Sequence, residues 1–315
     1  MTNTASADAR ALAQLRPWVQ AARPLAHPMI FVPLLLGQLF AAVVLGHFSW
    51  LQFGYATVFG VLYQIYLLYT NDHADAAIDK TNQQYWLSGG SRVIPEGRLG
   101  ANELQIGARV ALSLLCVLAL SIAVFGERLW LPIGVVVAVM LSWAYHRAPL
   151  QWSYRGHGEV LQGLGCGVLL PLIGYYLQCG SLVQFPWSTL LPMYIVFHAG
   201  NIVTALPDYR SDRAGRKRTF PVRHGEFAGR VTAVCLLVVA YTAAGFIALP
   251  FAVEERVVIV APAGFLLLAI AAMGLIRTAN VSDFRRCKQF VTWVSASQAW
   301  FLFAWAGVLL VQVSA

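Results

Sequence analysis

Long apolar segments constrain the fold of this sequence more than any other feature. Nine of them can be traced, over about residues 27–46, 51–70, 104–125, 129–146, 158–178, 187–206, 231–251, 256–276 and 290–312. An α-helix of about 20 apolar residues spans the hydrocarbon core of a bilayer, and it satisfies its own backbone hydrogen bonds there. The sequence therefore predicts an all-α, polytopic membrane protein, with nine transmembrane helices in one bundle over residues 23–315.

The composition agrees with a chain used mainly for membrane spans. Of the 315 residues, 58% are hydrophobic and 11% are charged, whereas soluble domains carry about 25% charged residues. Residues 1–22 lack the basic-then-apolar pattern of a signal peptide and are expected to form an N-terminal tail. The five cysteines show no Cys-x-x-Cys spacing, so neither a disulfide framework nor a zinc site is indicated.

Basic residues are distributed unevenly between the two sides of the predicted bundle. Of the 22 Lys and Arg residues, only Arg128 and Arg256 fall on one side. The positive-inside rule assigns the other side to the cytoplasm, with the N-terminus and the long loops over about 71–103 and 207–230, and leaves the C-terminus outside. We expect an integral protein of a bacterial inner membrane, whose net charge of +8 serves anionic lipid head groups rather than nucleic acid. Head-group contacts are expected above all for Arg210, Arg213 and Arg230.

An acidic run follows directly on the second apolar segment. If the helix continues through it, Asp72, Asp75 and Asp79 lie at i, i+3 and i+7 and project from one face, with Asn71 beside them. Carboxylates arranged in this way repel one another and call for a cation between them. Short Asp and Asn side chains offer the hard oxygen ligands that suit Mg²⁺, which commonly bridges to substrate phosphates.

A second acidic run follows the sixth apolar segment, where Asp208 and Asp212 lie at i, i+4. Either run alone is better explained as a solvated acidic helix end. Two runs that each close a long apolar segment favour a shared site, with two Mg²⁺ ions, in a central cavity opening near the cytoplasmic face. The basic candidates for neutralising the rest of a bound diphosphate are Arg92, Arg155, Lys217 and Arg218.

Two polar residues inside the sixth apolar segment align with the second acidic run. His198 and Asn201 lie at i, i+3, and Asn201 precedes Asp208 by seven residues, so the three can share one helix face. An intramembrane His or Asn often makes only an interhelical hydrogen bond. Their alignment with Asp208 instead favours acceptor binding for both residues, or metal support for Asn201.

The motif Asn71-Asp-x-x-Asp75-x-x-x-Asp79, with Asp208-x-x-x-Asp212 far downstream on a nine-helix bundle, resembles the UbiA superfamily of intramembrane prenyltransferases. The stretch DYRSDRAGRKRTFPVRHG, from Asp208 to Gly225, is similar to the menaquinone (1,4-dihydroxy-2-naphthoate) branch of that superfamily. The stretch from Tyr145 to Glu159 looks like the family's connection between the fourth and fifth helices, which implies that Tyr145 approaches the diphosphate.

The resemblance implies an Mg²⁺-dependent prenyltransferase. Its metal-loaded aspartates would ionise an allylic (poly)prenyl diphosphate, and an aromatic, quinone-precursor acceptor would take up the prenyl group. One alternative keeps the fold and the metal but has no acceptor, as in membrane terpene cyclases of this superfamily. A transporter or divalent-cation channel is a third hypothesis, but it is disfavoured because the carboxylates cluster at cytoplasmic helix ends rather than at mid-bilayer.

Overall fold

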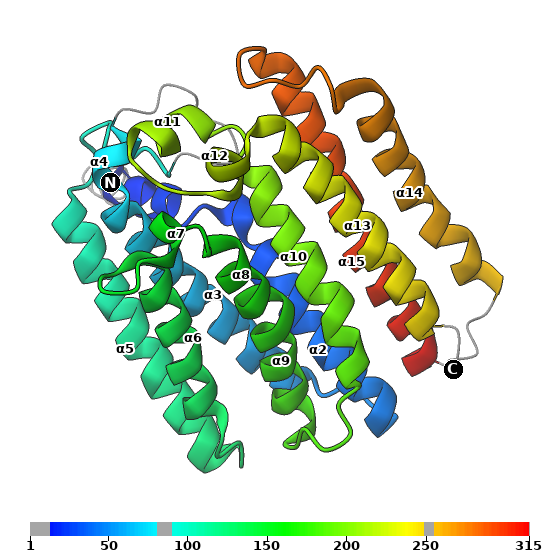
Figure 1. The fold of residues 1–315 in the computed structure, drawn as a ribbon. Helices are drawn as coiled ribbons and strands as arrows, with labels where there is room; N and C mark the ends of the chain where they lie inside the picture. Colours follow the sequence, from blue (N-terminus) through cyan, green and yellow to red (C-terminus); the bar gives the residue numbers. More distant parts are fainter. Residues whose placement is uncertain (1–12, 81–89, 249–254, 315) are drawn as a thin grey trace, which may run out of the picture.

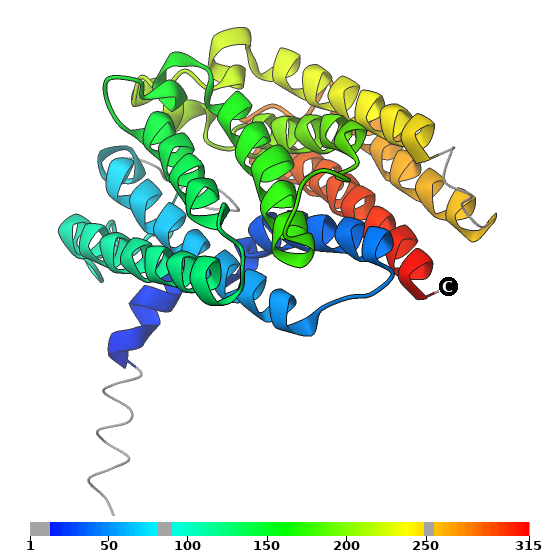
Figure 2. The same cartoon turned by 90° about the horizontal axis from the view of Figure 1, so that it is seen from below.

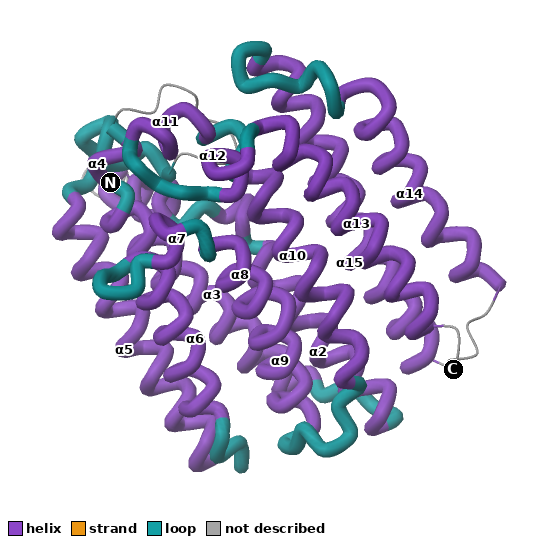
Figure 3. The backbone as a smooth tube through the Cα atoms, in the orientation of Figure 1, coloured by secondary structure: helices purple, strands orange, loops and turns teal. Residues whose placement is uncertain are grey.

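The structure is a computed structural model that describes residues 13–80, 90–248 and 255–314. Within those ranges the regular structure is helical throughout, with no strand (Figure 3). Among the described residues, six helices are long and apolar enough to cross a membrane: Pro28–Leu45, Trp50–Ala74, Ala101–Phe125, Gly158–Cys179, Glu226–Ile247 and Phe284–Val313. The all-helical fold predicted from the sequence is therefore confirmed for the part of the chain that is described.

The helices follow the predicted apolar segments in order (Figure 1). A short helix over 13–21 comes first. The elements after it are η1 (Pro24–Ala26), α2 (Pro28–Leu45), α3 (Trp50–Ala74), α4 (Ala76–Asp79), α5 (Ala101–Phe125), α6 (Leu131–His146), α7 (Trp152–Arg155), α8 (Gly158–Leu164), the π-helical turn η2 (Gly165–Leu169), α9 (Leu170–Cys179), η3 (Trp187–Thr189), α10 (Leu190–Thr204), α11 (Tyr209–Ala214), α12 (Phe220–His224), α13 (Glu226–Ala248), α14 (Glu255–Leu275) and α15 (Phe284–Ser314).

The long helices run side by side in one bundle, and the short helices α4, α7, α11 and α12 gather at one end of it (Figures 1 and 2). Two apolar cores fill the bundle. One joins α2 to α10, α13 and α15, and the other joins α2 and α9 to α3, α5 and α6. The helix α2 contributes to both cores, so it lies at the seam of the molecule.

The helices α2 and α9 cross very closely at this seam. A Cβ atom on Gly37 of α2 would collide with the backbone oxygen of Pro171, and one on Gly174 of α9 would collide with that of Leu34. Small residues at membrane helix crossings let the backbones approach in this way. The reciprocal pair of glycines fixes how these two helices meet, and it thereby fixes the spacing of the two cores.

Both acidic runs lie where a long helix breaks and a short one begins. The helix α3 ends at Ala74, Asp75 adopts φ −92° and ψ 6°, and α4 starts at Ala76. The prediction that one helix continues from Asp72 to Asp79 is therefore wrong. The break separates carboxylates that a continuous helix would have stacked on one face. In the second run, α10 ends at Thr204, shortly before Pro207, which cannot continue a helix.

The sequence suggested that Arg230 contacts lipid head groups, but its side chain is buried in the protein. It is 1% exposed, and its guanidinium donates to the carbonyl oxygens of Ile276 and Ala279 at 2.8 and 2.7 Å and to Asn280 Oδ1 at 3.0 Å. The prediction rested on the position of this charged residue near a helix end, where many arginines face lipid. Here the backbone after α14 leaves carbonyl groups without helical partners, and Arg230 of α13 satisfies them.

Candidate active site

A cavity of about 320 Å³ opens among the helices at the end of the bundle where both acidic runs lie. Residues from the first run, the second run and the loop after it line this one cavity. Those with polar side chains include Arg23, Gln64, Asn71, Asp75, Asp79, Ser142, Tyr145, His146, Gln162, Asn201, Asp208, Ser211, Asp212, Lys217 and Thr219. The fold thus brings together two motifs that are more than 120 residues apart in the sequence.

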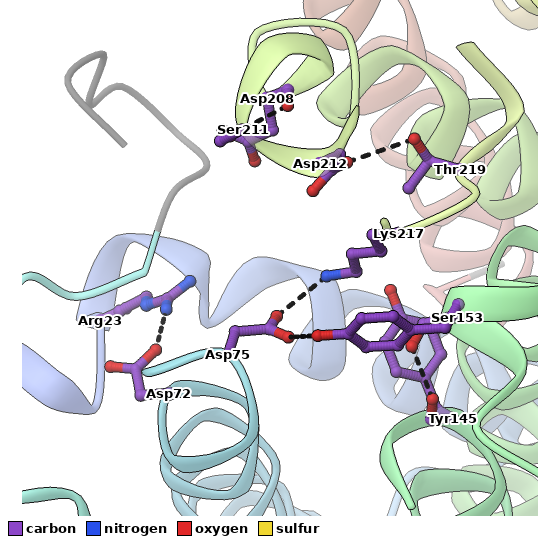
Figure 4. A network of polar contacts seen from close by, with 11 residues as sticks. Arg23, Asp72, Asp75, Tyr145, Ser153, Asp208, Ser211, Asp212, Lys217 and Thr219 are labelled. Carbon is purple, nitrogen blue, oxygen red and sulfur yellow. Dashed lines mark hydrogen bonds and ion pairs between the residues drawn. The ribbon is translucent and has the colours of Figure 1, made fainter. Parts of the chain in front are cut away.

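Asp75 links the two motifs directly. Lys217 Nζ donates to Asp75 Oδ2 at 2.9 Å (Figure 4). The Tyr154 hydroxyl donates to Asp75 Oδ1 at 3.4 Å. Burial acts to raise the pKa of Asp75, but the charge of Lys217 outweighs it and holds that pKa below its ordinary value. The same pairing raises the pKa of Lys217 well above its usual value despite the cost of burial. Both groups are therefore ionised at neutral pH.

Asp79 occupies the end of α4 and is 6% exposed. The chain returns past it at Gly90, whose φ is 78° and where a Cβ atom would collide with the Asp79 carboxylate. Only glycine fits this close approach without strain. Burial, followed by the negative charges of Asp75 and Asp72, raises the pKa of Asp79 to about 7. Arg23 and Lys217 lower this pKa only in part, and a further cation beside Asp79 would favour its ionised form.

The second motif presents its carboxylates from α11 and the residue before it. Asp208 is the N-cap of α11, and the backbone N–H of Asp212 donates to the Asp208 carbonyl oxygen at 2.8 Å. The Thr219 hydroxyl donates to Asp212 Oδ2 at 3.2 Å. Burial raises the pKa of Asp212 to about 7; Lys217 opposes this shift and Asp208 adds to it. Asp212 is therefore a second carboxyl group that a nearby cation would ionise.

The Asp72 side chain does not face the cavity, unlike those of Asp75 and Asp79. Its carboxylate accepts a hydrogen bond from the Arg23 guanidinium (Figure 4). It accepts another, at 3.2 Å, from the backbone N–H of Ser91. Asp72 is 2% exposed and is not among the residues that line the cavity, whereas Arg23 is. This ion pair places a guanidinium at the cavity wall beside the acidic groups.

The remaining predicted site residues divide into two groups. Asn71, Tyr145 and Asn201 line the cavity, and Asn201 donates to Gln162 Oε1. The others lie outside the lining, and their contacts with substrate stay a prediction: His198 meets the Tyr194 hydroxyl at 3.4 Å, Arg92 pairs with Glu96 at 3.2 Å, and Arg155 and Arg218 are exposed.

Three residues at the site were not among those singled out from the sequence. Arg23 precedes a proline before the first span, Tyr154 lies in α7, and Thr219 lies in the basic loop after the second motif. Each contacts one of the predicted aspartates. No spacing rule reveals the contacts of Arg23 and Tyr154, because each one joins segments that meet only in the folded bundle. Thr219 lies seven residues after Asp212, and its contact depends on the turn between α11 and α12. The one signal in the sequence was that Tyr154 and Thr219 lie in the stretches that resemble the family, Tyr145 to Glu159 and Asp208 to Gly225.

The donor set at the cavity fits Mg²⁺ held jointly with a phosphate ligand. Within the described ranges, no group of three or more Asp, Glu, His or Cys side chains forms a complete metal cage. Mg²⁺ seldom uses such a cage, because it usually keeps waters and binds one or two carboxylates together with substrate phosphates. Burial and neighbouring carboxylates raise the pKa values of Asp79 and Asp212 to about 7, so a cation bound beside them would favour the ionised form of both groups.

Comparison with known proteins identifies the family of this chain. A model of the UbiA prenyltransferase family matches residues 30–296. A 1,4-dihydroxy-2-naphthoate octaprenyltransferase from Escherichia coli (strain K12) is 26% identical over 237 residues, which cover 72% of this chain and 74% of the relative. One from Bacillus subtilis (strain 168) is 24% identical over 115 residues, or 36% of each chain.

Solved structures share the fold. A digeranylgeranylglyceryl phosphate synthase superposes with a TM-score of 0.65 at 17% identity, covering 94% of this chain and 99% of the other. A UbiA homologue from Archaeoglobus fulgidus, solved with GPP and Mg²⁺, gives a TM-score of 0.62 at 16% identity and covers 93% of this chain and 100% of its own. The family resemblance predicted from the motifs is confirmed: this chain belongs to the UbiA prenyltransferase family and is an integral membrane prenyltransferase.

Proposed function

We propose that this enzyme transfers a prenyl group from an allylic prenyl diphosphate to an aromatic, quinone-precursor acceptor. The observation that carries the proposal is that Asp75 and Asp79 line the same cavity as Asp208 and Asp212, with Lys217 bonded to Asp75. The relatives named as 1,4-dihydroxy-2-naphthoate octaprenyltransferases support a polyprenyl donor and an acceptor of that class.

We assign Mg²⁺, as two ions, to the acidic wall of the cavity. The homologue solved with GPP and Mg²⁺ supports this assignment, as does the excess of carboxylates over basic groups. When bound, Mg²⁺ would neutralise diphosphate oxygens and make the diphosphate a better leaving group. The residues that would hold it are Asn71, Asp75, Asp79, Asp208 and Asp212, and Asp72 joins them on release of Arg23.

The basic residues of the cavity act on the donor's head group. The bond that breaks joins the allylic carbon to the diphosphate oxygen, and its electron pair leaves with the diphosphate. Lys217, which stays ionised through its pairing with Asp75, and Arg23 provide fixed positive charge where this negative charge develops. Charge placed in advance within a largely water-free site stabilises a transition state strongly.

The other side of the cavity serves the cation and the acceptor. Leu67, Leu141 and Leu161 give it apolar walls that exclude water, which would otherwise trap the allylic cation. The ring of Tyr145 lines the same space and can stabilise the cation through its π face. An electron-rich ring carbon of the acceptor then forms the new carbon–carbon bond, and its proton passes to the released diphosphate. Asn201 is the polar group assigned to orient the acceptor.

We further propose that the bundle crosses the membrane nine times, with the aspartate end and the N-terminus facing the cytoplasm. The basic residues concentrated at this end support that orientation. The helix α15 ends at the opposite end of the bundle from α4 and α11 (Figure 1). The C-terminus is accordingly assigned to the outside, and the cavity opens toward the cytoplasmic surface.

The test is product analysis with the purified protein in liposomes. Labelled allylic diphosphates of several chain lengths are supplied with and without a panel of phenolic and naphthoic acceptors, in Mg²⁺ or in EDTA. We expect Mg²⁺-dependent release of diphosphate together with a prenylated aromatic product, detected by mass spectrometry. Hydrocarbon formed from the diphosphate alone would contradict transfer and select the cyclase alternative.

Two variants examine the aspartates in the same assay. Asp75→Asn and Asp212→Asn should each lower turnover by about 100-fold or more, because each removes charge from the site that ionises the donor. Asp283→Asn is the matched control, since Asp283 is a half-exposed carboxylate beyond the cavity that pairs with Arg286. Turnover at the wild-type level in either site variant, with a folded protein by size exclusion, would overturn the assignment.

A further inference from the structure

A second pocket lies on the outer side of the bundle at the same end as the aspartates. It has a volume of about 230 Å³ and is formed by α3, α5 and α6, which lie together at one edge of the molecule (Figures 1 and 2). The lining residues are Tyr66, Thr70, His73, Gln105, Ala108, Arg109, Leu112, Trp143 and Arg147. None of them lines the large cavity, so this pocket is separate from the active site.

The pocket carries positive charge that the described part of the protein leaves uncompensated. Arg109 and Arg147 line it, no Asp or Glu does, and neither guanidinium forms an ion pair with a carboxylate of the described residues. His73 adds a ring whose Nδ1 donates to the Ala101 carbonyl oxygen at 3.0 Å. An anion bound here would meet two cationic side chains presented by different helices.

The position of Arg109 makes an unpaired charge costly. It lies in the first half of α5, and no other charged residue occurs between Leu104 and Phe125. Its neighbours Ile106 and Val110 are 59% and 54% exposed, as expected of a surface that faces lipid. An arginine within a membrane span is expensive unless it reaches water or an anion, and such residues are usually functional. An anion that offsets the charge of Arg109 would therefore lie at the boundary between lipid head groups and acyl chains.

The surface beyond the pocket is apolar. Trp143 is 40% exposed, and Met140 and Val136, which follow it along the same face of α6 toward the opposite end of the bundle, are 61% and 55% exposed. On the other wall, Leu112 lies one turn beyond Arg109. A ligand that suits this arrangement has a negative group at one end and a hydrocarbon tail at the other.

We propose that this pocket is a binding site for an anionic phospholipid, with its phosphodiester between Arg109 and Arg147 and an acyl chain along α6. Basic pockets between transmembrane helices on the cytoplasmic side are known to take such head groups. The volume is smaller than the roughly 300–1,000 Å³ of pockets that enclose a drug-sized ligand, as befits a head group whose tails stay in the bilayer. The inference does not depend on the acceptor or donor assigned to the active site.

The test measures lipid retention by native mass spectrometry of the purified full-length protein. Phosphatidylglycerol and phosphatidylcholine with identical acyl chains are titrated in, and glycerol 3-phosphate serves as the head-group probe without a tail. We expect phosphatidylglycerol to bind well above phosphatidylcholine. The double variant Arg109→Gln/Arg147→Gln should bind phosphatidylglycerol about 25-fold more weakly, at about fivefold for each basic side chain.

Matched variants separate this site from a general charge effect. Arg277→Gln/Arg285→Gln removes two exposed arginines near the α14–α15 connection and should leave the preference for phosphatidylglycerol unchanged. Arg109→Lys/Arg147→Lys keeps the charge, and it should keep that preference even where the Gln pair fails to fold. Equal binding by the wild type and the Gln pair would overturn the proposal. So would loss of the preference in the Lys pair, or full competition by glycerol 3-phosphate at lipid concentrations.

Discussion

Lys217 holds the two acidic motifs in contact through its bond to Asp75. We predict that Lys217→Met lowers the turnover number by about 100- to 1,000-fold, because it removes a fixed positive charge from the side of the leaving diphosphate. Mg²⁺ affinity should not fall, since the variant frees Asp75. Turnover is measured with saturating donor, and Mg²⁺ binding by calorimetry. Lys288→Met is the control, because Lys288 lies in α15 outside the cavity, over the ring of Phe284. A loss of Mg²⁺ affinity equal to the loss of turnover would contradict the assignment.

The raised pKa values of Asp79 and Asp212, both about 7, give the metal-free protein a characteristic pH dependence. Each carboxyl group holds its proton more tightly in the folded chain than in the unfolded chain, where its pKa is about 4. The free energy of unfolding in EDTA should therefore fall as the pH rises from about 4 to about 7, and then level off.

Mg²⁺ should reverse that trend, because it displaces these protons. We expect its apparent affinity to rise between pH 6 and pH 8, and Asp79→Asn to weaken this dependence. Thermal unfolding in EDTA and in Mg²⁺ across the same buffers measures both effects. If the stability of the metal-free protein instead rises from pH 4 to pH 7, the pKa values of Asp79 and Asp212 are not raised in the folded protein.

The acidic residues of the site could be predicted from the sequence, but their individual surroundings could not. Asp72, Asp75 and Asp79 look equivalent in a motif. In the fold they face Arg23, Lys217 and the backbone at Gly90, respectively. Those partners come from three other segments of the chain, so their identity depends on tertiary packing that no local spacing encodes.

At the level of the helices, the crossing of α2 and α9 is the tightest contact to test. Gly174→Ala should lower the free energy of unfolding by about 1–3 kcal/mol, because its Cβ atom would meet the backbone of Leu34, which has no rotamer to adopt. Gly307→Ala is the control, since open space surrounds Gly307 in α15 and alanine favours the helix there. Equal effects of both substitutions on the melting temperature would refute the close crossing.

Arg230 connects α13 to the backbone after α14. Replacing it by leucine leaves three oxygen acceptors without their donor, so we expect a loss of about 2–4 kcal/mol in the free energy of unfolding. Proteolysis should then cut near Thr278–Asp283 in Arg230→Leu but not in Arg285→Leu, which alters an exposed side chain. Unchanged thermal stability and cleavage in Arg230→Leu would mean that the contact carries no stability.

The existence of the helices could be predicted much better than the places where they end. Apolar length predicted every long helix, because the bilayer imposes that length on the sequence. The break at Asp75 could not be foreseen, since Asn71 to Asp79 holds neither proline nor glycine. The contacts that Asp75 makes with Lys217 and Tyr154 favour the broken form, and both partners follow more than 75 residues later.

For the whole molecule, the proposed orientation can be tested with single cysteines in a background without native ones. Ser181 lies in the turn after α9, and Ser282 lies between α14 and α15 at the other end of the bundle (Figure 1). A membrane-impermeant maleimide should label Ser181→Cys in intact cells and Ser282→Cys only after lysis. The opposite pattern would reverse the assigned sides.

The bond between Asp75 and Lys217 joins residues 142 positions apart, which sets an order of events during biosynthesis. At a translation rate of about 5–20 residues per second, the first acid cluster waits roughly 7–30 s for its basic partner to leave the ribosome. From the chain made before the cluster, Arg23 supplies the ion pair to Asp72. The nascent enzyme thus inserts half of its proposed metal site well before the remainder exists.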